Sequence, residues 1–131
     1  MRYLVCLIIG LAIGALTATT VQNVLLARDV WPRSIMQVMQ HELAGARHDI
    51  RARHCADADL ESSFAHLALI SGDIEPAVQP EKPPDRIFAN HVARLRQAIA
   101  MARATGPDCE RRLPALAAIG EACDACHRDY R

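Results

Sequence analysis

The residues best suited to chemistry gather at the C-terminal end of the chain, in the stretch EACDACHRDYR (residues 121–131). Within it, Cys123, Cys126 and His127 form the pattern Cys-x-x-Cys-His. Residues three positions apart lie on the same side of a helix, so both thiols can reach one ligand. The adjacent histidine adds an imidazole nitrogen, a common ligand of iron and zinc. The stretch therefore predicts a site that attaches or coordinates a cofactor.

Three kinds of site use closely spaced cysteines, and the rest of the sequence separates them. A structural zinc site needs a second pair of ligands, and the sequence contains no second Cys-x-x-Cys. A thioredoxin-type redox pair belongs with strands, and the chain shows no strand pattern. Cys-x-x-Cys-His is the attachment motif of c-type haem. We therefore predict one covalently bound haem c, with Cys123 and Cys126 as thioether residues and His127 as the proximal iron ligand.

The N-terminal segment explains how such a cofactor could be attached, because haem attachment requires export. Residues 3–21 carry no charge and nothing more polar than threonine, and they are long enough to span a membrane once. A cleaved signal peptide has a shorter apolar core and a small-residue cleavage site, and residues 15–20 match that site only imperfectly. We predict an uncleaved signal anchor and short linker over residues 1–27, with a cleaved signal as the alternative.

The remainder of the chain, residues 28–131, carries four helical patterns. Apolar residues recur at helical spacing over about 29–53, 57–71, 85–105 and 113–131, and the proline content of 71–84 predicts a loop. Amphipathic helices with mostly short connections pack as antiparallel neighbours. The predicted fold is all-α: an antiparallel up-down four-helix bundle preceded by one N-terminal transmembrane helix.

Two further cysteines fall between the predicted helices. Cys55 lies in the connection between the first and second helices of the bundle, and Cys109 in that between the third and fourth. An up-down bundle places both connections at the same end, opposite the predicted haem. In an oxidising compartment the two residues could form a disulfide. The alternative is two free thiols.

Composition limits the remaining function classes. The formal net charge is zero and the pI is near 7.0, so no basic surface favours a nucleic-acid partner. We find no hydrolytic triad, phosphate-binding loop or acid–base pair, and we expect a protein that is not an enzyme. Aromatic residues make up only 4% of the chain. A core with so few large side chains favours a cofactor that fills it.

The C-terminal motif carries a family resemblance. A Cys-x-x-Cys-His followed closely by an aromatic and a basic residue, here CDACHRDYR, on the last helix of an exported bundle resembles the class II cytochromes c. This family includes the cytochromes c prime and their low-spin relatives with His/Met ligation. The resemblance covers about residues 29–131 and leaves the N-terminal segment outside.

The resemblance implies where a second iron ligand would come from. In the low-spin branch a methionine near the start of the first helix takes this position, and Met36 matches it in this chain, with Met39 and His41 as alternatives. The start of the first helix and the end of the fourth lie at the same end of an up-down bundle, so Met36 and His127 could meet across one haem. Met36 could instead be ordinary core packing.

The resemblance also implies supporting residues, a location and a function. Arg33 and Arg131 are candidates for contacts with the haem propionates or the haem edge, and each could instead be an exposed surface arginine. We expect a haem domain in the periplasm, tethered by a single pass to the bacterial inner membrane, and capable of homodimer formation. Its expected role is to carry single electrons between redox partners, either a redox protein or a membrane respiratory or photosynthetic complex. The alternatives are a five-coordinate protein that binds gases such as NO or CO, and a haem-carrying accessory subunit of a membrane redox complex.

Overall fold

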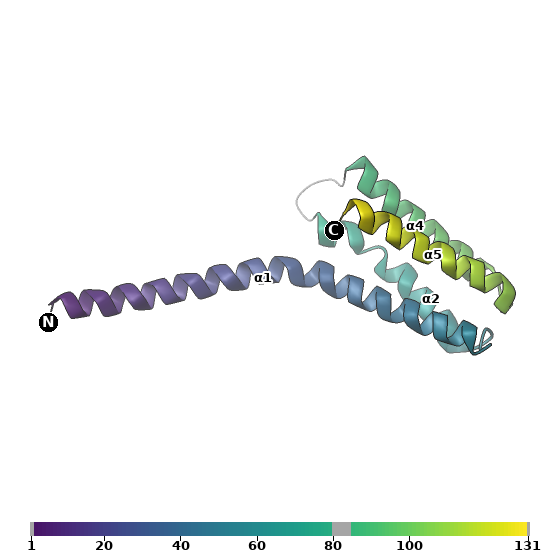
Figure 1. The fold of residues 1–131 in the computed structure, drawn as a ribbon, viewed down its shortest axis with the longest axis horizontal. Coiled ribbons are helices and arrows are strands. Elements are labelled where there is room, and N and C mark those ends of the chain that lie inside the picture. Colours follow the sequence, from purple (N-terminus) through teal and green to yellow (C-terminus); the bar gives the residue numbers. More distant parts are fainter. Residues whose placement is uncertain (1, 80–84, 131) are drawn as a thin grey trace. The chain divides into compact units, whose positions relative to one another are not determined.

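The computed structural model describes residues 2–79 and 85–130, and within α1 it leaves the side chains of residues 2, 4, 5 and 24–29 undescribed. The described residues form α-helices and no strand, which confirms the all-α prediction (Figure 1). The helices are α1 (Arg2–Arg51), α2 (Ala58–Ile70), α3 (Ile74–Val78), α4 (Arg86–Ala104) and α5 (Cys109–Asp129).

Helix α1 covers two segments that the sequence patterns separated. The predicted membrane segment (3–21) and the predicted first bundle helix (29–53) belong to one 50-residue helix. Residues 15–31 contain no glycine or proline, so nothing in this stretch interrupts the backbone hydrogen bonds. Contacts divide the chain into two compact units, Met1–Arg33 and Ser34–Arg131, whereas the predicted boundary lay between residues 27 and 28.

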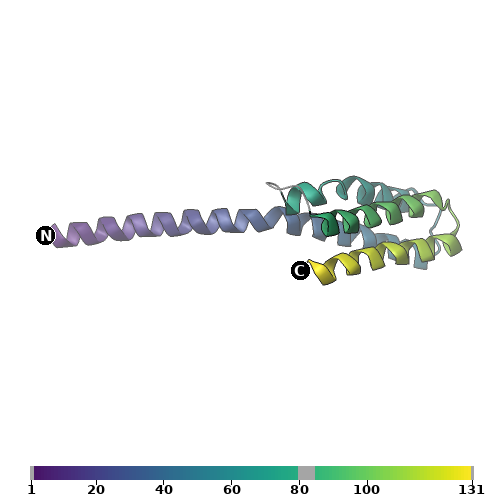
Figure 2. The same cartoon turned by 90° about the horizontal axis from the view of Figure 1, so that it is seen from above.

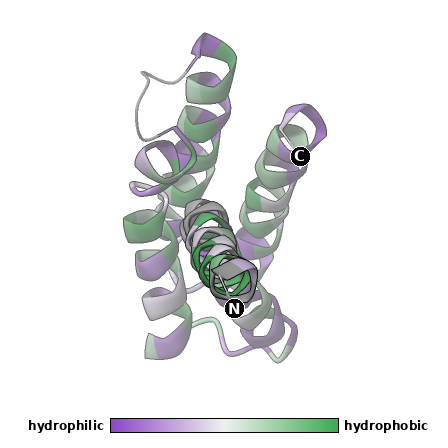
Figure 3. Cartoon of the chain, turned by 90° about the vertical axis from the view of Figure 1, so that its left-hand side faces the viewer, coloured by the Kyte–Doolittle hydropathy of each residue, from purple (hydrophilic) through white to green (hydrophobic). Residues whose placement is uncertain are grey.

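The first unit is an apolar helix. Its stretch Cys6–Asn23 has a mean hydropathy of 1.5 and none of it is buried, so by length and composition it could cross a membrane. Figure 3 looks along the N-terminal helix and shows hydrophobic residues, in green, within it. The hydroxyls of Thr17, Thr19 and Thr20 donate to carbonyl oxygens three and four positions earlier. The polar groups of these threonines are therefore satisfied within the helix, as a lipid environment requires.

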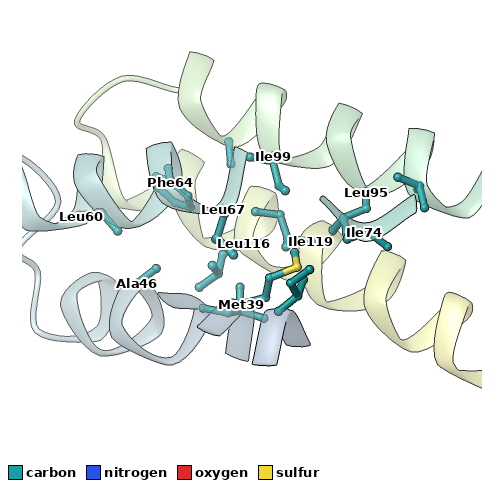
Figure 4. Packing of buried hydrophobic residues seen from close by; sticks show 14 of the residues in the cluster. Met39, Ala46, Leu60, Phe64, Leu67, Ile74, Leu95, Ile99, Leu116 and Ile119 are labelled. Atoms are coloured by element: carbon teal, nitrogen blue, oxygen red, sulfur yellow. The ribbon is translucent and has the colours of Figure 1, made fainter. Parts of the chain in front are cut away.

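The second unit has one hydrophobic core, to which α1 from Ser34 onward, α2, α3, α4 and α5 all contribute (Figure 4). Polar contacts join neighbouring helices of this unit. Glu42 of α1 meets His66 of α2 at 3.1 Å, and Tyr130 after α5 donates to Asp85 before α4 at 2.8 Å. Figure 2 shows α4 and α5 running side by side.

Helix α3 corrects part of the predicted loop at 71–84. One short helix forms at Ile74–Val78, and Ile74 and Ala77 are buried in the core. Arg96 of α4 holds this segment by donating to the Ser71 carbonyl and to the Glu75 carboxylate. Pro76 falls in the first turn, where its missing N–H costs no hydrogen bond. Residues 80–84 of the predicted loop lie outside the described residues.

The turn between α4 and α5 begins where the sequence pattern predicts, near residue 105, but it is shorter than predicted. Gly106 has a φ of 68°, a conformation that favours glycine after a helix. Asp108 then caps α5, which begins at Cys109 rather than near residue 113, because the Asp108 carboxylate accepts from the Glu110 N–H. Cys109 is therefore the first residue of α5 and not part of a loop.

A buried arginine joins this turn to α2. Arg112 is 1% exposed; it donates to the Gly106 carbonyl and to the Glu61 carboxylate, and its guanidinium lies 5.7 Å from the centroid of the Phe64 ring. Burial of a charged group is costly unless the charge is paired, and Glu61 supplies the opposite charge. The interaction fixes where the start of α5 meets the start of α2.

The structure also joins Cys55 and Cys109 in a disulfide, with their Cα atoms 5.4 Å apart. Cys55 follows α1 and is buried. Since Cys55 and Cys109 are 54 positions apart, the bond removes much conformational freedom from the unfolded chain.

We predict that replacing both cysteines (Cys55→Ala with Cys109→Ala) lowers the free energy of unfolding by about 4 kcal/mol, the value expected for a loop of this length. Chemical unfolding of the two proteins, monitored by circular dichroism, measures the difference. Treatment with a thiol reductant should destabilise the unsubstituted protein and leave the double variant unchanged. Equal stability of the two proteins would contradict the prediction.

Candidate functional site

A cavity of about 180 Å³, partly open to solvent, lies within the second unit. This volume is smaller than the roughly 300–1,000 Å³ that is typical of pockets for small molecules and cofactors. Most of the wall comes from α1, α4 and α5. Its lining residues are Met36, Met39, Gln40, Leu43, Arg47, Leu67, Ile74, His91, Val92, Leu95, Ile119, Gly120, Cys123, Asp124, Cys126 and His127.

The α5 wall carries the motif that the sequence singled out. Cys123, Cys126 and His127 all line the cavity, each partly buried, and both cysteines are free thiols. Helical spacing brings them to one side of α5, because Cys123 and Cys126 are one turn apart. The helix continues only to Asp129, so the motif occupies its last turns.

The α1 wall contributes two methionines. Met36 is partly exposed, whereas Met39 is 5% exposed and lies beside Leu116 and Ile119 in the core (Figure 4). Both line the same cavity as His127. The third candidate, His41, is exposed and does not line it. The structure therefore brings Met36 and Met39, but not His41, to the motif.

The predicted arginine contacts are not tested by this arrangement. Arg33 belongs to the first unit, and Arg131 lies outside the described residues, so both contacts stay predictions. Arg47 of α1 instead lines the cavity, although the sequence analysis had not selected it. A side chain on Gly120 would meet the Arg47 guanidinium at 3.1 Å, so the absence of one leaves room for this cation. Helical spacing could have identified Arg47 as a lining residue. It places Arg47 on the same face of α1 as Met36, Gln40 and Leu43.

The thiols are held in their protonated form. Burial raises the pKa of Cys123, with further increases from Asp124 and Cys126, while Arg47 acts in the opposite direction. Burial also raises the pKa of Cys126, and the Asp129 carboxylate adds to it. Reactive cysteines in redox enzymes and thiol proteases have a lowered pKa. This environment therefore does not favour thiol–disulfide exchange or nucleophilic catalysis.

No cluster of three or more histidine, cysteine or acidic side chains among the described residues is arranged to hold a metal ion directly. The sulfur and imidazole side chains that line the cavity are spread over three helices, with sulfur on α1, an imidazole on α4, and sulfur and an imidazole on α5. Such a set could hold a cofactor that itself extends across the cavity, with the thiols at its edge and a histidine and a methionine as axial groups.

A second group of polar contacts lies at the same end of α5, and we name it the C-terminal clasp. It consists of Asp85, Phe88 and His91 from the start of α4, and of Asp129 and Tyr130 from the end of α5. His91 donates from Nε2 to Asp129 Oδ2 at 2.9 Å, and the Tyr130 hydroxyl donates to both carboxylate oxygens of Asp85, at 2.8 and 2.9 Å. The rings of Phe88 and Tyr130 meet edge to face, 5.2 Å apart. His91 is 9% exposed and lines the cavity.

A comparison of the chain with family models, with curated proteins and with solved structures finds no match. The cavity, the residues that line it and the apolar N-terminal helix are therefore the basis for the function proposed below. Among these features, the most specific chemistry comes from the cysteine motif and the two methionines, which line the same cavity.

The C-terminal clasp leads to a prediction about acid stability. The Phe88 N–H and then the Tyr130 hydroxyl, which both donate to Asp85, lower the pKa of this carboxyl below its ordinary value. A lowered folded-state pKa contributes stability that is present above about pH 4 and is lost as the pH falls through the folded-state pKa. Asp85→Asn keeps an oxygen that can cap α4 but cannot ionise.

We therefore expect the unsubstituted protein to be more stable than Asp85→Asn at pH 7, and this difference to shrink below about pH 4. Chemical unfolding of both proteins at pH 7, 5, 4 and 3 measures it. Asp108→Asn, at the cap of α5, is the matched control for an exposed helix cap. A difference that stays constant over this pH range would contradict the prediction.

Proposed function

We propose that this protein is a membrane-tethered c-type cytochrome, of the kind found in class II, that carries single electrons between redox partners and is not an enzyme. The observation that carries the proposal is the cavity in which Cys123, Cys126 and His127 of α5 meet Met36 and Met39 of α1. The sequence motif suggests the attachment of haem, and the cavity supplies a place for it between two helices that bear suitable axial groups.

The cavity walls fit a covalent haem c in chemistry. Most of the lining side chains are apolar, which suits a large flat apolar cofactor. Cys123 and Cys126 would hold the haem through thioether bonds to its two vinyl groups. Both thiols lie on one side of α5 and line the cavity.

His127 and Met36 would hold the haem iron. A bound haem would supply an iron that gains and loses one electron at a time, and a His/Met pair would raise its reduction potential. Met36 is the better candidate because its side chain is partly exposed and lines the cavity, whereas Met39 is buried beside Leu116 and Ile119. Two protein ligands would leave no open position for small gases, which favours electron transfer over gas binding.

The fold that we propose is the antiparallel four-helix bundle of this family, made from α1 (from Ser34), α2, α4 and α5. Three contacts support it: Glu42 with His66 between α1 and α2, Arg96 with the end of α2, and the C-terminal clasp between α4 and α5. Helix α3 would be an addition within the connection from α2 to α4.

The proposed location is the periplasmic face of a bacterial inner membrane. The stretch Cys6–Asn23 would anchor the chain with a single pass. The Cys55–Cys109 disulfide favours an oxidising compartment for the second unit, as haem attachment also requires. A tether raises the effective concentration of a partner in the same membrane, such as a respiratory or photosynthetic complex, and could also favour homodimers.

One observation favours a second candidate function, the binding of gases such as NO or CO. Met39 is buried in the core. If Met36 also served only for packing, neither methionine of the α1 wall would bind the haem iron. An accessory haem subunit of a membrane complex would share the anchor and the cavity but would act only within that complex.

We predict that the exported protein shows the absorption spectrum of a low-spin haem with a band from the methionine–iron bond, and that carbon monoxide does not change it. Met36→Ala should lose this band and become high-spin and responsive to carbon monoxide, while Met39→Leu, a matched control that conserves volume, should keep it. A high-spin unsubstituted protein would shift the function to gas binding. The absence of any covalent haem would reject the proposal altogether.

We also predict that the mature protein keeps its N-terminal segment and is released from membranes by detergent but not by alkaline carbonate. The mean hydropathy of Cys6–Asn23 suits insertion rather than surface binding. Membrane fractionation and the intact mass of the purified protein test this, with a chain that begins at Ser34 behind a cleavable signal as the soluble control. An intact mass that lacks the first residues would show that the segment is a cleaved signal.

A further inference from the structure

We infer that His91 is a positioning residue for the cofactor site: by holding Asp129, it fixes the last turn of α5 and with it the axial residue His127. The inference rests on the proposed function, because it concerns the same site. It assigns a role to a histidine on α4 that the Cys-x-x-Cys-His motif does not contain.

The last turn of α5 needs such support. A helix end leaves backbone carbonyls without partners and tends to fray, and His127 lies two residues before the end of α5 at Asp129. One backbone bond, from the Tyr130 N–H to the Cys126 carbonyl at 2.9 Å, continues the turn. Any motion of this turn would move the His127 side chain.

His91 supplies the support from inside the protein. Its ring is 9% exposed, and a buried ring nitrogen requires a partner, which Asp129 Oδ2 provides at 2.9 Å. A carboxylate can only accept, so Nε2 carries the hydrogen. His91 and His127 also line the same cavity. The bond therefore connects the cavity wall on α4 directly to the turn that carries the axial residue.

The other members of the clasp act at different points. The Tyr130 hydroxyl lies beyond the helix and donates to Asp85, which precedes α4, and the Tyr130 ring meets the His91 ring edge to face at 6.1 Å. Asp129 follows His127 by two residues in α5. His91–Asp129 is thus the clasp hydrogen bond that joins a residue of the cavity lining to the turn that carries His127.

The chain contains a matched pair for comparison. His66 binds Glu42 at 3.1 Å, so it also joins two helices through a histidine and a carboxylate. Neither His66 nor Glu42 lines the cavity. If a histidine–carboxylate bond mattered only for stability, loss of either pair would affect the protein in the same way.

The test uses the full-length protein with its haem attached and compares the reduction potential and the methionine–iron band in several variants. His91→Leu removes the bond but keeps an apolar side chain, and His91→Gln keeps an amide N–H in place of Nε2. His66→Leu is the control. Because His91→Leu could prevent folding, Asp129→Ala removes the same bond from a residue that is 54% exposed and tolerates change.

We expect His91→Leu and Asp129→Ala to weaken the methionine–iron band. At the midpoint potential of the unsubstituted protein, each variant should also change the ratio of oxidised to reduced protein by about threefold to tenfold, because one net hydrogen bond has an effect of this size. His91→Gln should restore the unsubstituted values, and His66→Leu should lower thermal stability without moving either signal. If Asp129→Ala leaves both signals unchanged, the inference is wrong while the proposed function stands. If the unsubstituted protein carries no haem, both are wrong.

Discussion

The constraint on which the rest of this structure depends is the cavity between α1, α4 and α5. A cavity with mainly apolar walls removes packing contacts from a small core, and the helices around it lose that stabilisation. The second unit compensates with polar and covalent ties at both ends of α5. The Cys55–Cys109 disulfide and Arg112 hold its start, and the C-terminal clasp holds its end.

These ties also decide which helix faces meet. Arg112 and His91 are both buried, and each is paired with a carboxylate of another element. Separating either pair would leave a buried polar group without its carboxylate partner, so each pair disfavours alternative positions of the helices. These contacts at the two ends of α5 therefore hold the helices that form the cavity walls. The helices keep their positions without side-chain packing across the cavity.

The proposed cytochrome would divide its work between the two units. The first unit offers an apolar surface with its threonine hydroxyls satisfied internally, which suits an anchor in lipid. The second unit places two protonated thiols and an imidazole in the last turns of α5, next to two methionines of α1. The residues of the redox site would then not need to contact lipid. The tether would keep the site near its partners in the membrane.

The sequence by itself determined the features that depend on local order: the helical class, the apolar N-terminal stretch, and the motif that places Cys123, Cys126 and His127 on one side of a helix. It also indicated that a helix ends near residue 105, just before Gly106, which has a positive φ. It did not reveal α3, because one helical turn held by Arg96 has too short a pattern to recognise. Only the tertiary structure decided that Met36 and Met39 line the cavity while His41 does not, and that Arg47 and His91 do. The physical reason is that local spacing fixes the face of a helix on which a residue lies, whereas the packing of distant helices fixes what that face meets.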